Sequence, residues 1–270
     1  MTTSTKRSSN RVIADPRLTQ RRQQVARSKT RRRVLVVGVM FSVVLAAGGG
    51  WALLHTSLFS AKTVTVSGAT HESDAQVVAA AGLQHHPALI SIDAGAAEAG
   101  IDALAWVKTS SVSLHWPSTV KITVTERTPV AVVSSGADVA LVDASGRVLV
   151  YQHAPTAPEA ASLAKGLIPI VTAKPITLAV GSSVPDWVHG SLQVAGSLPL
   201  AFKGQVAQIH ANTDGTVTLQ LTTPVTVTMG TATQLEQKYS DIASVIAGAT
   251  LHPGDVLDVT VPQASTITGP

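Results

Sequence analysis

The chain has 270 residues, a formal net charge of +4 and no cysteine. The absence of cysteine excludes disulfide bridges, thiolate metal sites and thiol catalysis. Few aromatic residues and many Val, Ala and Thr residues favour a β-rich fold with helices built from small residues, and the length allows one large or two small folded domains.

The first 54 residues combine a basic segment with an uncharged one. Residues 1–33 carry eleven Lys and Arg residues against one acidic residue, Asp15, which gives a net charge of +10. Residues 34–54 contain no charged residue and would span about 30 Å as a helix, the thickness of the hydrocarbon core of a bilayer. Because Lys and Arg collect on the cytoplasmic side, we predict a cytoplasmic tail at 1–33, a transmembrane helix at 34–54 and an extracytoplasmic remainder. A cleaved signal peptide is the alternative, although the apolar run exceeds a usual signal-peptide core.

The basic tail predicts contact with anionic lipids, from which each Lys or Arg near a membrane gains roughly 1 kcal/mol. Blocks of like charge are usually disordered arms. A cytoplasmic protein partner is an alternative to lipids. Nucleic acid is not expected, because the tail has no aromatic residues for base stacking.

Small residues recur at every fourth position of the uncharged run and therefore share one face of the predicted helix. They are Gly38, Ser42, Ala46 and Gly50. Small residues at this spacing let two transmembrane helices approach closely, so we predict helix packing on this face. Chance is the alternative, because Ala47, Gly48 and Gly49 lie off the face.

From residue 62 the pattern changes to short strands and helices. Residues 62–67 (KTVTVS) alternate polar and apolar side chains and predict a strand that ends at Gly68. Ser73 and Gln76 have the spacing of a capping box and predict the start of a helix, with Gly82 at its C′ position.

A second helix and two strands follow. Asp93 is the predicted N-cap of the helix, and Ala97, Ile101 and Leu104 form its apolar side. Residues 107–115 and 119–126 are two predicted strands joined by a Trp-Pro-Ser turn, and alternation in the second strand predicts one buried and one solvated face.

The order β-α-α-β-β resembles a POTRA module, and the sequence resembles the FtsQ/DivIB family of bitopic cell-division proteins. The shared motifs are a strand that ends in Gly, a Trp-Pro turn before the last POTRA strand, and a closing Glu-Arg-x-Pro-x-Ala. The residues that carry them are Gly68, Trp116, Pro117, Glu126, Arg127, Pro129 and Ala131. The resemblance implies a POTRA domain at 62–128 and a β domain at 129–270. Because neighbouring residues of a strand point to opposite faces, Glu126 and Arg127 are interpreted mainly as junction residues, with direct partner contact as the alternative.

The second domain reads as a series of short β-patterned runs with two helices. Residues 143–146 predict a hairpin turn, in which Asp143 is a turn residue and no catalytic acid. Ser183 is the predicted cap of a helix whose core residues include Trp187, Val188, Leu192 and Ala195. Residues 233–247 predict a second helix that Gly248 ends. Its apolar stripe includes Leu235, Tyr239, Ile242, Val245 and Ile246, with Tyr239 in the core, and its Lys238 follows the pattern of the resembled family.

The chain closes with two predicted strands, 255–261 and 264–268, around a turn at Pro262-Gln263. A C-terminal strand at a sheet edge exposes backbone groups that another chain can pair with. In the resembled family this end receives a segment of the FtsB/DivIC partner by strand addition, and the tail after Thr268 is short here. The predicted partner-binding residues are Val256, Asp258, Val259, Thr260, Val261, Ser265, Thr266, Ile267 and Thr268.

The sequence carries no recognisable catalytic, phosphate-binding or metal-binding pattern. Of the nine histidines only His85 and His86 are adjacent, and a Gly-x-Ser-x-Gly elbow and a Ser-x-x-Lys pair are both absent. We therefore predict that the protein is no enzyme and uses no metal, cofactor or small-molecule substrate.

The predicted fold is α+β: a single transmembrane helix, a POTRA module and a mixed, β-rich C-terminal domain. The resemblance implies a bitopic scaffold of the bacterial division machinery, enriched at the septum, that assembles and regulates septal cell-wall synthesis. The implied partners are FtsB/DivIC-type and FtsL-type proteins, with a septal transpeptidase and FtsW-type proteins as further candidates. A POTRA protein of envelope translocation or assembly and a membrane-tethered envelope hydrolase are the alternatives.

Overall fold

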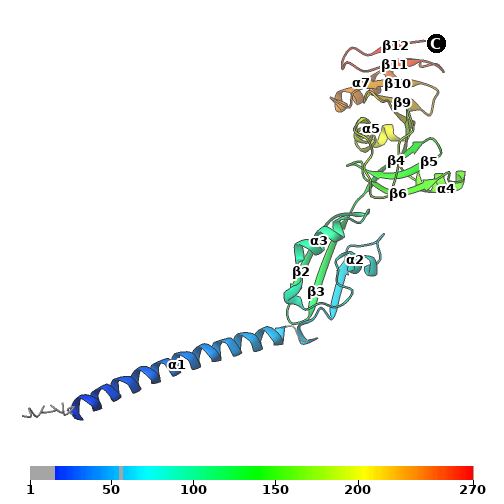
Figure 1. Cartoon of the computed structure of the whole chain (residues 1–270). Coiled ribbons are helices and arrows are strands. Elements are labelled where there is room, and N and C mark those ends of the chain that lie inside the picture. Colours follow the sequence, from blue (N-terminus) through cyan, green and yellow to red (C-terminus); the bar gives the residue numbers. More distant parts are fainter. Residues whose placement is uncertain (1–15, 55–56, 270) are drawn as a thin grey trace, which may run out of the picture. The chain divides into compact units, whose positions relative to one another are not determined.

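The computed structural model describes residues 16–54 and 57–269, in two compact units that divide after Ser60. Residues 1–15, the first part of the predicted tail, lie outside the described residues. The two units are described separately below (Figure 1).

The first unit is dominated by one long helix, α1 (Pro16–Leu54), followed by the short 3-10 helix η1 (Ser57–Phe59). The helix begins well before the predicted residue 34, so the second half of the basic tail is helical and the expectation of a disordered arm is wrong there. The reason is local, because Arg, Gln and Ala are good helix formers. Among the described residues, one segment, Arg33–Ala52, is long and apolar enough to cross a membrane.

The second unit opens with the predicted order β-α-α-β-β. The elements are β1 (Thr63–Ser67), α2 (Asp74–Ala80), the 3-10 turn η2 (Leu89–Ser91), α3 (Ala94–Asp102), β2 (Val107–His115) and β3 (Thr119–Glu126). Both predicted helix starts are confirmed: Ser73 forms a capping box with Gln76, and the Asp93 side chain caps α3. Gly82 takes the predicted C′ position, with φ +71°.

These strands form a sheet of order β1-β3-β2, in which β1 is parallel and β2 antiparallel to β3 (Figure 1). Side chains of β3 alternate between buried and exposed as predicted, and the buried ones pack with α2 and α3. The fully buried members of this core include Val77, Ile101, Val107, Val120 and Ile122. Gly68 has φ +87°, and a Cβ atom there would collide with the carbonyl oxygen of Val124, so the predicted strand end requires glycine.

The rest of the chain builds a nine-stranded sheet of order β12-β11-β10-β9-β8-β7-β4-β5-β6. Its strands are β4 (Pro129–Ser135), β5 (Asp138–Asp143), β6 (Val148–His153), β7 (Ile168–Thr172), β8 (Val206–Ala211), β9 (Val217–Leu221), β10 (Thr226–Gly230), β11 (Val256–Asp258) and β12 (Thr266–Thr268). The pairs β4–β7, β7–β8 and β10–β11 are parallel, and the other pairs are antiparallel. The overall class is therefore α+β, as predicted.

Four helices accompany this sheet: α4 (Ala157–Leu163), α5 (Asp186–Ser197), α6 (Leu200–Lys203) and α7 (Leu235–Gly248). The large core joins α5 and α7 to the sheet, and the predicted core residues Val188, Leu192, Tyr239 and Ile242 are all buried in it. A smaller cluster of Val132, Leu141 and Leu149 contacts α4 and also Trp106.

Two predicted helix starts are wrong. The N-cap of α5 is Pro185, because the backbone of Ser183 bridges to Arg147 next to β6 and cannot begin a helix. The helix α7 begins at Leu235 after Gln234, which has φ +53°. In both places long-range or backbone constraints outweigh the local capping pattern.

Candidate functional site

The candidate binding edge is the C-terminal side of the nine-stranded sheet, where β12 pairs, among the described residues, only with β11. The antiparallel register joins Val256 to Thr268, Leu257 to Ile267 and Asp258 to Thr266. The large apolar side chains exposed along this edge are Val256 (38%), Ile267 (44%) and Val261 (61%). An edge strand with exposed apolar side chains offers backbone groups for pairing and side chains for specificity.

Both predicted edge strands are shorter in the structure than in the sequence reading. The first ends at Asp258, and just beyond it the Asp258 carboxylate accepts the N–H of Thr260 (2.8 Å), a local turn contact. The hydrogen bonds from Thr260 lower the pKa of Asp258. The second strand begins only at Thr266.

The prediction that Val259 binds a partner is wrong. The side chain of Val259 is fully buried in the core, and its backbone N–H donates to the carbonyl of Thr228 (2.9 Å). The remaining predicted residues are exposed, apart from the half-buried Ser265. The predicted turn at Pro262-Gln263 is present, and the N–H of Gln263 is held by the Asp241 carboxylate of α7 (2.8 Å).

A buried lysine on α7 binds the end of β10, the strand next to β11. The side chain of Lys238 in α7 is 1% exposed, and its ammonium donates to the carbonyls of Met229 (2.7 Å) and Thr231 (2.8 Å). These two residues flank Gly230, which has φ +66° and where a Cβ atom would lie 2.8 Å from Thr260. Burial lowers the pKa of Lys238, while the charge of Asp258 opposes that shift. The lysine thus fixes the end of β10, against which the segment after β11 lies.

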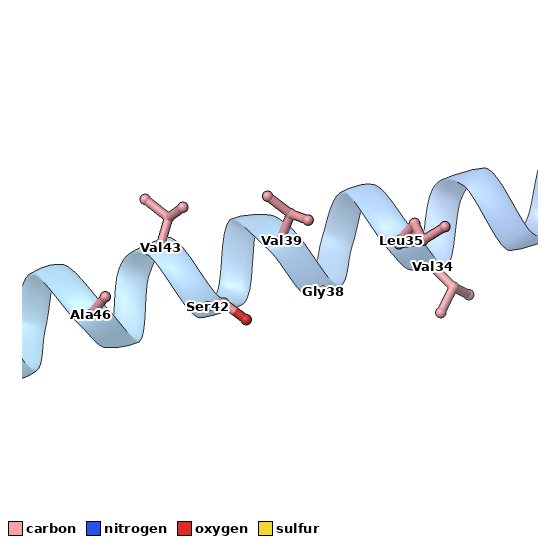
Figure 2. A pocket seen from close by; sticks show the side chains of 7 residues that line it. All are labelled: Val34, Leu35, Gly38, Val39, Ser42, Val43 and Ala46. Atoms are coloured by element: carbon pink, nitrogen blue, oxygen red, sulfur yellow. The ribbon is translucent and has the colours of Figure 1, made fainter.

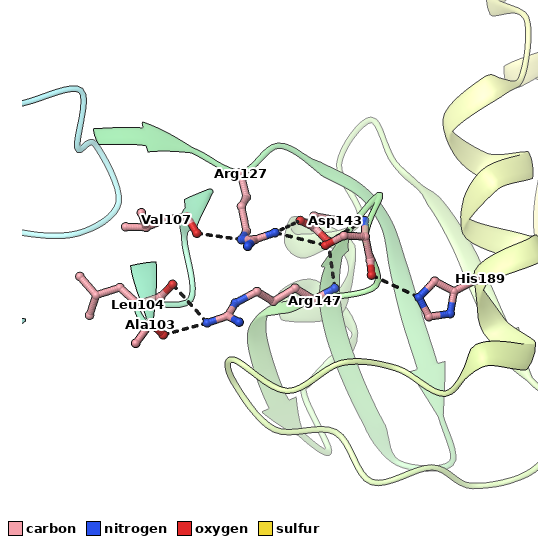
Figure 3. Close-up of polar contacts among 8 residues, drawn as sticks. Ala103, Leu104, Val107, Arg127, Asp143, Arg147 and His189 are labelled. Carbon is pink, nitrogen blue, oxygen red and sulfur yellow. Dashed lines mark hydrogen bonds and ion pairs between the residues drawn. The ribbon is translucent and has the colours of Figure 1, made fainter. Parts of the chain in front are cut away.

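The second cluster lies where the POTRA-like module meets the β domain (Figure 3). The guanidinium of Arg127 donates to the carbonyl of Val107 (2.8 Å) and to the Asp143 carboxylate (2.8 Å). The other oxygen of Asp143 accepts the N–H groups of Ser145 and Arg147 (both 2.9 Å), which confirms its predicted place in the hairpin turn. Burial raises the pKa of Asp143, but the bonds from Arg127, Ser145 and Arg147 together lower it below its ordinary value of 3.8.

A second arginine crosses the same junction. Arg147 donates to the carbonyls of Ala103 (2.8 Å) and Leu104 (3.4 Å), just beyond the end of α3, where carbonyl groups lack helical partners (Figure 3). A ring nitrogen of His189 lies 3.2 Å from the carbonyl oxygen of Ser145, so α5 also contacts this hairpin. Sequence reading missed the contacts of Arg147, which belongs to no motif.

Glu126 turns away from the Arg127 cluster, as the strand alternation predicts. Its carboxylate accepts the N–H groups of Thr70 and His71 and contacts the His71 ring (2.7 Å), and that ring stacks on Trp106 with centroids 3.8 Å apart. Burial raises the pKa of Glu126, but the bonds from His71 and Thr70 lower it overall. Arg127 thus contacts both domains, whereas these contacts of Glu126 lie within the POTRA-like module.

We expect a double-mutant cycle of Arg127→Met and Asp143→Asn to give a coupling energy of about 1–2 kcal/mol near pH 7. Asparagine keeps an oxygen for the turn and removes the charge that faces Arg127. Because the folded-state pKa of Asp143 lies below 3.8, this contribution is present above that value and is lost as the pH falls through the folded-state pKa. Urea unfolding at pH 7 and at lower pH measures it. A coupling energy near zero at pH 7 would contradict the pairing.

The predicted helix-packing face lies on α1 and forms a shallow groove (Figure 2). Gly38, Ser42 and Ala46 line it together with Val34, Leu35, Val39 and Val43. A Cβ atom at Gly38 or Gly50 would meet no other atom of the chain within 4 Å, but the same holds for Gly48 and Gly49. The space around these glycines therefore does not distinguish the predicted packing face from the other faces of α1.

Replacing Gly38 and Ala46 by leucine tests whether this face packs against another membrane helix. If it does, the added side chains keep the two backbones apart and recovery of a co-purifying membrane protein from detergent extracts falls. The matched control is Gly48→Leu with Ala47→Leu, off the face. Equal recovery from the two double variants would refute specific packing.

Within the described parts of the chain, residues 16–54 and 57–269, no three His, Asp or Glu side chains gather into a group that could hold a metal ion. Of the adjacent pair His85 and His86, His86 contacts the backbone: one of its ring nitrogens lies 2.7 Å from the carbonyl oxygen of Ala61.

Comparison with known families agrees with this geometry. Residues 59–127 match the model of the POTRA domain, FtsQ-type, and residues 131–259 match that of the Cell division protein FtsQ/DivIB, C-terminal. The second match ends at Val259, before β12.

Several curated relatives carry the name Cell division protein FtsQ. The protein of Mycobacteroides abscessus is 26% identical over 229 residues, which are 85% of this chain and 68% of that protein, and that of Mycolicibacterium smegmatis is 28% identical over 87% and 65%. The protein of Streptomyces collinus is 29% identical over 90% of both chains. This chain thus spans about two thirds of the length of the two mycobacterial relatives. The two family models together cover most of its length, and the chain belongs to the FtsQ/DivIB family of cell division proteins.

Proposed function

We propose that the protein is a non-enzymatic, single-pass membrane scaffold of the bacterial division machinery. The segment Arg33–Ala52 of α1 is its membrane anchor, with the basic N-terminus in the cytoplasm near anionic lipids. A POTRA domain (62–128) and a β domain (129–270) lie outside the membrane. The charge asymmetry on the two sides of the anchor supports this orientation.

The observation that carries the proposal is the open C-terminal edge of the nine-stranded sheet. β12 presents three exposed residues, and within residues 16–54 and 57–269 it pairs on one side only, with β11. We infer that a segment of an FtsB/DivIC-type partner adds to this edge as a further strand. FtsL-type proteins, a septal transpeptidase and FtsW-type proteins complete the assembly that regulates septal wall synthesis.

Localisation tests the role in division. A fluorescent fusion of the full chain, expressed in its own host from the native promoter, is expected to be enriched at mid-cell in dividing cells. A membrane-localised protein of unrelated function serves as the control, because the two membranes that lie close together at the septum raise the fluorescence of any membrane protein there. An even distribution around dividing cells would contradict the proposal.

A further inference from the structure

The chain enters the POTRA domain at Ala61, whose side chain is fully buried. The N–H of Ala61 donates to the carbonyl of Pro87 (2.9 Å), and the N–H of Thr63 donates to the carbonyl of Ser118 (3.2 Å). The loop after α2 and the β2–β3 hairpin therefore border the point of entry. In the sheet, the start of β1 lies beside the start of β3, as their parallel register requires.

Large apolar side chains are exposed at this end of the domain. Among residues 61–128, all of which the structure describes, they are Ile90 (47%) and Trp116 (53%). Single exposed apolar side chains are common on protein surfaces. These two, however, belong to the two segments at the entry point, whereas the opposite end of the sheet faces the β domain through Arg127 and Arg147.

The charge at the entry end has one sign. Residues 61–63, 83–92 and 115–121 include Lys62 and Lys121, three histidines and no acidic residue. The chain after residue 33, by contrast, carries nine Lys and Arg residues against fifteen acidic ones. Tryptophan is enriched at membrane–water interfaces, and basic residues there are attracted to anionic lipids.

Covalent geometry keeps this end near the membrane that holds α1. Seven positions separate Leu54, the last residue of α1, from Ala61, so their Cα atoms lie at most about 25 Å apart. We propose that the entry end of the POTRA domain, marked by Lys62, Ile90 and Trp116, docks on the lipid headgroup region of that membrane. This inference rests on the proposed anchoring by α1.

Fluorescence quenching in nanodiscs tests the proposal on the full chain. Because the chain has no cysteine, single-cysteine variants take one NBD label each: Ser42→Cys in the anchor, Ser91→Cys beside Ile90, and Thr125→Cys at the far end of β3. The discs hold one copy of the chain in phosphatidylcholine and phosphatidylglycerol with doxyl-labelled lipid. We expect quenching at positions 42 and 91 and little at 125.

The same measurement in an Ile90→Ser, Trp116→Ser background should abolish quenching at position 91 and preserve it at position 42. An unchanged circular dichroism spectrum and melting temperature would show that the variant is folded. Quenching at 42 without quenching at 91 would overturn the docking proposal while leaving the anchor intact. Quenching at 91 that persists in the double variant would overturn it as well, because the tether alone would then explain proximity. Absence of quenching at 42 would overturn the anchor itself.

Discussion

Replacing Lys238 by methionine is expected to lower the free energy of unfolding by about 2–3 kcal/mol. The methionine side chain has a similar length, but it leaves the carbonyls of Met229 and Thr231 without the ammonium donor that now binds both. Each hydrogen bond to a charged group contributes about 1.5–3 kcal/mol. Removal of the buried ammonium offsets part of this loss, since burying an ion costs several kcal/mol. The nearby charge of Asp258 reduces that cost in the native protein, so the loss of the two bonds prevails.

Urea unfolding of the detergent-solubilised full chain, followed by tryptophan fluorescence, measures this effect. Lys174→Met is the matched control: Lys174 is exposed, and the change is expected to stay within about 0.5 kcal/mol. An increase in stability on replacing Lys238 would mean that desolvation of the ammonium outweighs both hydrogen bonds.

The effect of Lys238→Met on the free energy of unfolding is also expected to depend on pH, in a direction that the pKa of Lys238 sets. Burial lowers the pKa of Lys238 below its ordinary value of 10.5, so the folded chain holds this proton less tightly than the unfolded chain. The resulting cost is present below the folded-state pKa and is relieved as the pH rises from that pKa toward 10.5. The stability difference between the native chain and Lys238→Met should therefore widen over that range, and a constant difference would contradict the assigned burial.

Deletion of residues 265–270 is expected to abolish binding of the FtsB/DivIC-type partner and to leave folding nearly unchanged. The deletion removes β12, whose three residues are all exposed and contribute no side chain to the core. Binding is measured by co-purification of the co-expressed partner from detergent-solubilised membranes, and folding by urea unfolding. His153→Ala, an exposed position on β6 at the opposite edge of the sheet, is the control that should bind normally. Full recovery of the partner with the shortened chain would contradict the edge-strand proposal.

The POTRA region could be predicted nearly element by element, because its signals are local. The capping box at Ser73 and Gln76, the N-cap at Asp93 and the alternation of β3 each reflect interactions within a few residues, and all three are confirmed. In the β domain the helix α4 was missed although Thr156 and Glu159 form a capping box, and β7 was missed because Pro169 interrupts its pattern.

The remaining features depend on contacts that sequence spacing does not reveal. The predicted helix places Lys238 on α7, but its burial against the end of β10 depends on the fold. The pairing of Arg127 with Asp143 joins two motifs that are each recognisable, but their contact follows only from the junction geometry. The early end of β11 coincides with a local turn, in which the Asp258 carboxylate accepts the backbone N–H of Thr260. Val259 continues the alternation of β11, in which Leu257 is buried and Val256 and Asp258 are exposed, so its burial follows a strand parity that the predicted partner-binding set did not apply.

Site-specific photo-crosslinking shows whether a partner chain lies against β12 in living cells. A photoreactive phenylalanine analogue replaces Ile267 on β12 or, as the matched control, Val150 on β6 at the other edge, in the full chain expressed in dividing cells. We expect a crosslink to the FtsB/DivIC-type partner from position 267 and none from position 150. Equal crosslinks from the two edges, or none from position 267 in a membrane-localised chain, would contradict it.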